Sequence, residues 1–126
     1  KTPESTALSP LFSRWMLSYA RDYMTPITHA KAESIEHARS VKEVRFRRTK
    51  SKWGHCSSTG VIQFNWLIML APPAVVDYLI AHEVCHLVHL NHSKAYWDLV
   101  ASICPDYQVQ RKWLRDHEHR FRLVGL

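Results

Sequence analysis

The feature that most constrains the fold is a His-Glu-x-x-His motif within an apolar segment. His82 and His86 are four positions apart, so on an α-helix both imidazoles project from one face and can reach one metal ion. Glu83 lies about 100° further round the helix, where it can reach a water molecule beside the metal. Two histidine ligands, a third ligand from elsewhere and one open position are typical of a catalytic zinc site.

The segment around the motif, residues 72–90, predicts one largely buried helix. Pro72 and Pro73 suit its first turn. Apolar residues cover much of the helix circumference: Val75, Val76, Leu79, Ile80, Val84, Leu87 and Val88. Because buried imidazoles and carboxylates are costly unless they are paired or coordinated, a metal site explains the motif better than core histidines bonded to backbone carbonyls.

The third metal ligand has three candidates: His89, His92 and Cys85. His89 points from nearly the same helix face as the motif, but it lies about 10 Å along the axis from the first histidine, too far to share one ion. His92 can return over the site if Asn91 adopts the left-handed conformation that ends helices and Ser93 caps a new helix. We therefore predict His92 as the ligand, with His89 as a flanking group and Cys85 as a packed helix residue.

The other helices are predicted from caps and prolines. Ser9-Pro10 begins a helix that Thr25-Pro26 ends, and residues 27–40 permit a second short helix. After the motif, helices are expected at 94–104 and 107–119.

Strands are predicted before the motif. Apolar and basic residues alternate over residues 41–50, residues 51–60 are rich in Ser, Gly and Lys, and residues 60–66 form a second apolar run. We expect a strand, a loop and a strand, the second strand being antiparallel to the first or to a neighbour. The predicted class is α+β, with a small antiparallel or mixed sheet packed on the motif helix.

Bulk properties narrow the partners and the location. The net charge of +6 favours an anionic partner, such as nucleic acid, a nucleotide or an acidic substrate segment. Three cysteines without framework spacing indicate reduced thiols and a cytoplasmic location. No apolar run approaches the about 20 residues of a membrane span, so no membrane partner is expected. The length predicts a single domain over residues 1–126.

The motif belongs to a long ordered series of segments: Trp53-Gly54-His55-Cys56-Ser57-Ser58, Asn65-Trp66, Ala71-Pro72-Pro73, Asp77-Tyr78, His82-Glu83-Val84-Cys85-His86-Leu87, Asn91-His92-Ser93, Tyr96-Trp97, Cys104-Pro105-Asp106-Tyr107 and Lys112-Trp113-Leu114. In this series residues 41–119 resemble the YgjP-like metallopeptidase family, related to the SprT and WLM zinc proteases. The departures are Lys52, usually Arg in the family, and His55, usually Ser.

The resemblance implies a zincin-like fold of the gluzincin type, with one zinc ion per chain on His82, His86 and His92. It implies that Glu83 is the general base in peptide-bond cleavage through a zinc-bound water. Family members often carry β-rich sequence further upstream, so we expect this chain to be the C-terminal part of a longer protein. The motif is not that of a metzincin, because His89 stands where those enzymes have Gly.

Further residues are candidates for substrate contacts. Zinc peptidases commonly need a second electrophile beside the metal, and His89 or Tyr96 could donate to the developing oxyanion. Asn65, near a strand end, could orient a substrate backbone. If the metal lies beside an edge strand, a substrate peptide could add to that edge through main-chain hydrogen bonds.

The densest basic cluster offers a candidate anion-binding surface: Arg45, Arg47, Arg48, Lys50 and Lys52. It is either a solvated strand face or a phosphate-binding surface, since Arg presents a planar fork of donors to phosphate oxygens. Trp53 beside it either anchors the loop or stacks on a base.

Three hypotheses about function result. The first is a zinc metallopeptidase that cleaves peptide or protein substrates. The second is a metal-dependent nucleotide phosphohydrolase that uses the basic cluster from Arg45 to Lys52. The third is a nucleic-acid-binding module with a structural zinc, for which Cys85 or His89 would be a fourth ligand.

Overall fold

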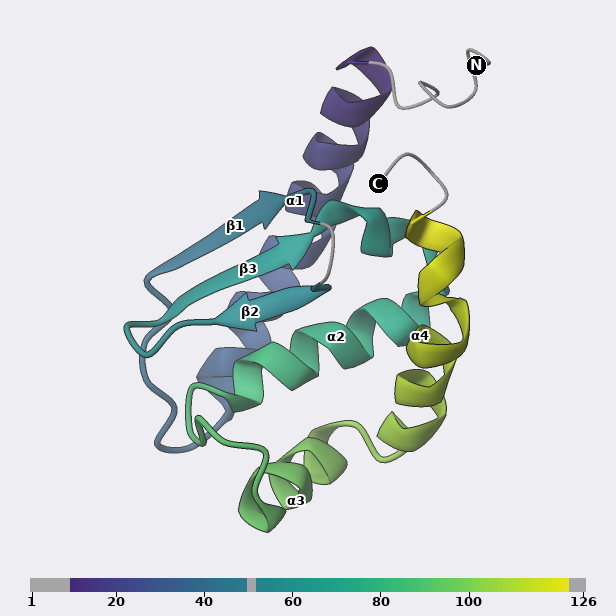
Figure 1. Ribbon diagram of the computed structural model, residues 1–126. Helices are drawn as coiled ribbons and strands as arrows, with labels where there is room; N and C mark the ends of the chain where they lie inside the picture. Colours follow the sequence, from purple (N-terminus) through teal and green to yellow (C-terminus); the bar gives the residue numbers. More distant parts are fainter. Residues whose placement is uncertain (1–9, 50–51, 123–126) are drawn as a thin grey trace.

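The computed structural model describes residues 10–49 and 52–122, and these form the predicted α+β fold (Figure 1). In chain order the elements are α1 (Pro10–Ser34), β1 (Glu43–Arg47), β2 (Gly54–Cys56), β3 (Val61–Asn65), the 3-10 helix η2 (Trp66–Leu70), α2 (Pro73–Cys85), α3 (Lys94–Ile103) and α4 (Tyr107–Arg122).

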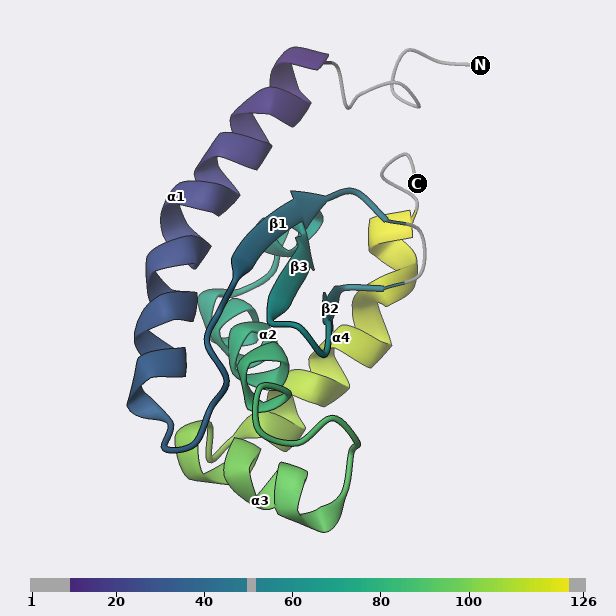
Figure 2. The ribbon, with the colours of Figure 1, turned by 90° about the vertical axis from the view of Figure 1, so that its left-hand side faces the viewer.

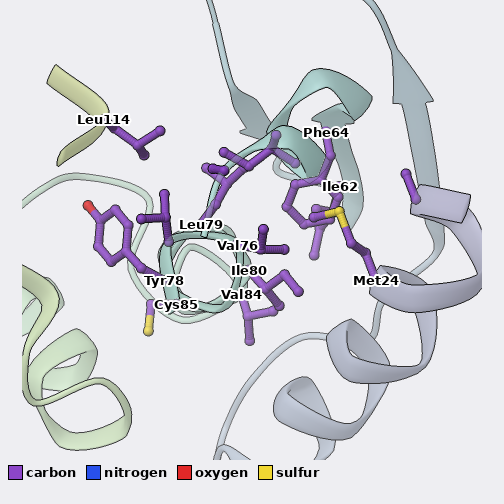
Figure 3. Packing of buried hydrophobic residues seen from close by; sticks show 14 of the residues in the cluster. Met24, Ile62, Phe64, Val76, Tyr78, Leu79, Ile80, Val84, Cys85 and Leu114 are labelled. Atoms are coloured by element: carbon purple, nitrogen blue, oxygen red, sulfur yellow. The ribbon is translucent and has the colours of Figure 1, made fainter. Parts of the chain in front are cut away.

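Helix α2, which carries the motif as far as Cys85 and is capped by His86, is the centre of the fold. It contacts α1, α3, α4, β2 and η2, and Figure 2 shows α1, α3, α4 and β2 arranged around it. Figure 3 shows Met24 of α1 and Phe64 of β3 packing with Ile80 on one side of α2, while Tyr78 and Leu114 lie on the other. Because α2 is apolar on nearly all sides, it is stable only when neighbours cover it all round.

The sheet has three strands in the order β1-β3-β2. Strand β3 is antiparallel to β2, as predicted for a neighbour, but it is parallel to β1. Strand β2 lies in the stretch predicted to be a loop, and that prediction is wrong. Its three residues are too few to show alternation, and the pairing of Gly54 with Phe64 and of Cys56 with Ile62 defines the strand.

The prediction that the first helix ends at Pro26 is wrong, because α1 continues through it to Ser34. Proline within a helix removes one hydrogen bond and costs about 3 kcal/mol. Met24, Thr28 and Ala32 are buried on the inner face of α1, and the Thr28 hydroxyl donates to the Met24 carbonyl at 2.7 Å. Burial of this face on both sides of Pro26 offsets the lost bond.

Helix α2 ends five residues before the predicted end, at Cys85 rather than residue 90. Its last turn tightens, since the amides of Leu87 and Val88 donate to carbonyls only three residues back. Asn91 does not adopt the predicted left-handed conformation; in the described part of the chain the one non-glycine residue with positive φ is His37. Residues 86–92 therefore form a longer connection than predicted.

The helices after the motif follow the prediction closely. Helix α3 begins at Lys94, and the Ser93 hydroxyl caps it by accepting from the Tyr96 amide at 3.2 Å. Helix α4 begins at Tyr107 as expected. Within residues 10–49 and 52–122, no helix combines the length and the apolar character needed to cross a membrane.

Candidate metal centre

Three histidines converge on one point. One ring nitrogen each of His82, His86 and His92 lies within 4.8 Å of the other two, and Nε2 of His86 is 3.1 Å from Nε2 of His92. His82 lies on α2, His86 is the residue that caps the C-terminal end of α2, and His92 comes from the connection before α3. Three convergent imidazole nitrogens are a donor set that suits zinc and leaves a fourth position open, so this cluster could hold a metal ion.

Hydrogen bonds orient two of the rings. Nδ1 of His86 donates to the carbonyl of His89 at 2.9 Å, and Nδ1 of His82 lies 3.1 Å from the Tyr78 hydroxyl. Each bond occupies Nδ1 and leaves Nε2 for a ligand, the arrangement usual for metal-binding histidines. Burial lowers the pKa of His82 to about 3 and also lowers the pKa of His86. Both rings are therefore neutral at pH 7, as coordination requires.

Aromatic side chains pack against the histidine cluster. The Tyr96 ring stacks on His86 with the centroids 4.5 Å apart, and its hydroxyl donates to the His82 carbonyl at 2.6 Å. Tyr96 is fully buried, and burial raises the pKa of its hydroxyl, which stays protonated. The Trp97 ring lies 5.6 Å from that of His92. These contacts restrict the rotamers of the histidines.

Glu83 lies beside the cluster in the same pocket and is only 4% exposed. Its carboxylate packs against Gly54 of β2, where an added Cβ would be 2.6 Å from Oε2. Burial raises the pKa of Glu83 to about 8, although the charge of Lys52 opposes the shift. A carboxyl group with such a pKa can accept a proton and return it near neutral pH.

The pocket has a volume of about 490 Å³ and is open to solvent. Besides the histidines and Glu83, residues of β2, α2 and α4 line it: Gly54, His55, Cys56, Tyr78, Leu79, Arg111 and Leu114. Strand β2 pairs only with β3, so it is an edge strand. One wall of the pocket is therefore a strand whose outer edge has no partner among the described residues.

A family model described as a YgjP-like metallopeptidase domain matches residues 1–117. The chain belongs to the YgjP-like family. The match covers the histidine cluster and Glu83, and it confirms the resemblance seen in the sequence. The architecture, a small mixed sheet with helices around α2, is consistent with the zincin-like fold expected for this family. No curated protein matches the chain in sequence.

In this YgjP-like domain, the other residues predicted to contact the substrate already form hydrogen bonds within the fold. Asn65 is buried, its Oδ1 accepting from the Leu67 amide at 3.0 Å and its Nδ2 donating to the Thr49 carbonyl at 3.1 Å. The single hydroxyl proton of Tyr96 is used on the α2 backbone. His89 contributes its carbonyl to the site, and its ring does not line the pocket. Substrate contacts from these side chains would require their present bonds to be exchanged.

The basic cluster of the YgjP-like domain is divided between two surfaces. Arg45 pairs with Glu43 at 3.0 Å, and Arg45 and Arg47 line a separate hollow beside β1 with Arg21. Lys52 lines the metal pocket at the other edge of the sheet. Arg48 is half-buried after β1, and Lys50 lies outside the described residues. Half-buried Trp53 packs against the core, which fits the loop anchor, the first of its two predicted roles, and it also lines the pocket.

Several residues at the site were not predicted to have a role. Tyr78 had a signal, because it stands four residues before His82 and shares its helix face. Gly54 and Arg111 had none, since their contacts come from elements distant in the sequence. Arg39 was also missed: its guanidinium donates to the carbonyls of His86 at 2.7 Å and Leu87 at 3.0 Å, and to Ser58, closing the end of α2.

Proposed function

We propose that this chain is a zinc metallopeptidase that hydrolyses peptide bonds in peptide or protein substrates. His82, His86 and His92 would hold one zinc ion, and Glu83 would be the general base. The observation that supports this most is the placement of a buried carboxyl group and three convergent imidazoles in a single open pocket. The fold and the family agree with it.

The chemistry is divided between the ion and the chain. A zinc ion bound here supplies Lewis acidity, which makes a water molecule easier to deprotonate and polarises a scissile carbonyl. Glu83 takes a proton from the attacking water at its carboxylate and later gives it to the nitrogen of the leaving amine. Its raised pKa, about 8, suits both transfers. Tyr96 and Tyr78 act as supports that hold His86 and His82 in place.

The free edge of β2 is the proposed substrate platform. An extended peptide would add to this edge as a further strand through main-chain hydrogen bonds. Because Gly54, His55 and Cys56 line the pocket and Gly54 contacts Glu83, such a peptide would pass beside the general base. The geometry favours extended, unfolded segments over folded proteins as substrates.

The test compares the wild type with Glu83→Gln, both loaded with zinc, on an unfolded protein substrate followed by gel electrophoresis. We expect fragments from the wild type alone, with equal zinc content in the two proteins. Fragments from Glu83→Gln at the wild-type rate would overturn the assignment of the base. Parallel lanes with single-stranded DNA test whether the basic residues recruit nucleic acid as an activator.

The nucleotide phosphohydrolase is the second candidate, and the position of Lys52 in the metal pocket favours it. The rest of the basic cluster supports it less, because Arg45 and Arg47 line a different hollow. Intact protein substrate in every lane, together with release of phosphate from a nucleoside triphosphate that Glu83→Gln abolishes, would favour this function over the peptidase.

A structural zinc is the least supported alternative. Within residues 10–49 and 52–122 the cluster contains three ligands, and neither Cys85 nor His89 joins it. Cys85 is buried in the core on the other side of α2 from β3, beside Tyr78.

The single domain over residues 1–126, its place in a longer protein and the cytoplasmic location stay predictions.

A further inference from the structure

Arg111 is a cation in the wall of the metal pocket, and no acidic residue pairs with it among the described residues. It lies on α4 and lines the pocket together with the histidine cluster and Glu83. In the part of the chain that the structure describes, the ion pairs join Arg45 to Glu43, Lys94 to Asp98 and Lys112 to Asp116, and none involves Arg111. Its guanidinium donors are therefore available to a ligand in the pocket.

The guanidinium is held in place by an aromatic ring. Its Cζ lies 4.6 Å from the centroid of the Trp97 ring, a cation–π contact. Trp97 is fixed in turn, because Tyr107 stacks on it at 5.2 Å and the rings of His82 and His92 lie 5.9 and 5.6 Å away. Arg111 is exposed, so this contact restricts its side chain only in part, but it keeps the charge next to the proposed metal ligands.

The remaining charges of the pocket favour an anion. Its lining contains one carboxyl group, that of Glu83, against the cations Lys52 and Arg111. The Glu83 carboxylate packs against Gly54 of β2, on the wall of the pocket that β2 forms. Apolar side chains, Leu79, Leu90 and Leu114, make up much of the remainder. In such surroundings an arginine fork binds a carboxylate by two parallel hydrogen bonds.

We propose that Arg111 binds a carboxylate of the substrate, so that the pocket selects peptides with an acidic group near the cleaved bond. This inference rests on the proposed peptidase function and names its substrate class. The carboxylate has two sources, a Glu or Asp side chain and the C-terminus of the peptide. Both present the same planar pair of oxygens to the guanidinium.

The test measures binding as well as turnover. Zinc-loaded Glu83→Gln protein is titrated with fluorescent peptides that share one sequence. One carries internal Glu and an amidated C-terminus, a second carries Gln in its place, and a third carries Gln with a free C-terminal carboxylate. We expect the first or the third to bind about tenfold or more tightly than the second, and whichever does identifies the source of the carboxylate.

Substitution of the arginine isolates its role. Arg111→Ala, added to Glu83→Gln, should remove the preference for the carboxylate and leave the affinity for the Gln amide peptide unchanged. Arg111→Lys should restore part of the preference, because it keeps the charge without the planar fork. Arg115→Ala, one turn further along α4 and away from the pocket, is the matched control and should behave as the parent.

Two outcomes of the binding titrations would overturn the proposal. The first is equal binding of all three peptides to the parent protein. The second is an equal loss of affinity for all three peptides in Arg111→Ala, which would mean that the arginine only supports Trp97. Peptides that are cleaved by the wild type without regard to charge overturn the role of Arg111 alone, whereas a wild type that neither binds nor cleaves any peptide overturns the peptidase function itself.

Discussion

The carboxylate of Glu83 lies directly against the α-carbon of Gly54, one residue on the central helix and the other on the edge strand. A Cβ at position 54 would be 2.6 Å from Oε2, 3.0 Å from Cγ and 3.1 Å from Cδ of Glu83. The first distance is shorter than real Cβ contacts and the other two are tighter than most of them, so a side chain there would require the carboxyl group to shift. The glycine is explained by contact with the proposed base.

Gly54→Ala should therefore lower kcat while the protein still binds zinc. Displacement of a catalytic group by about 1 Å can cost about a hundredfold in rate. Peptide turnover and zinc content measured on the same samples check this, with exposed Ser58→Ala in the following turn as the control. Unchanged kcat in Gly54→Ala would mean that the carboxyl group can move aside without loss of function.

Tyr78→Phe should weaken zinc binding. The substitution removes the hydroxyl that lies 3.1 Å from Nδ1 of His82 and keeps the ring in place. Loss of such a partner typically lowers metal affinity about tenfold to a hundredfold. Competition with a chromogenic chelator measures the Kd for zinc. Tyr19→Phe, on the exposed face of α1, should leave it unchanged. Equal Kd values for Tyr78→Phe and the wild type would contradict the orienting role.

Zinc should raise the Tm of the wild type, because a ligand that binds only the folded state stabilises it by about 2.7 kcal/mol at a hundred times its Kd. His92→Ala should lose most of this shift, since its ring nitrogen is one of the converging three. His89→Ala should retain the shift, because the bond to His86 uses the main-chain carbonyl of residue 89. Thermal unfolding with and without a chelator tests both; a retained shift in His92→Ala would point to another third ligand.

Arg39→Ala should destabilise the fold. Its side chain donates to the carbonyls of His86 and Leu87 and to Ser58, joining the end of α2 to two other segments. Hydrogen bonds from a charged group contribute about 1.5–3 kcal/mol, and we expect a loss of that size in urea unfolding. Exposed Lys42→Ala is the control, and Arg39→Lys should restore only part of the stability. A loss of stability below about 0.5 kcal/mol would mean that contacts other than those of Arg39 stabilise the end of α2.

Patterns between close neighbours in sequence were enough to predict the α+β class, the helices beginning at Lys94 and Tyr107, and a strand over residues 60–66, which the structure has at Val61–Asn65. The same local reasoning missed β2, ended the first helix at Pro26 and extended the motif helix to residue 90. In each of these cases the deciding contact is distant. Strand β2 exists through its pairing with β3, α1 continues because its face is buried, and α2 ends just before the carbonyls of His86 and Leu87, which Arg39 binds.

The site divides in the same way. The sequence by itself determined that His82 and His86 share one helix face with Glu83 next to them, because four residues make about one helical turn. It also determined membership of the family, through segments spread along the chain. Only the tertiary structure brought Gly54 against Glu83, Arg111 over Trp97 and Tyr96 under His86. These pairs join different elements, and the distance between those elements depends on how the whole core packs. The periodicity of residues along one helix or strand carries no information about that distance.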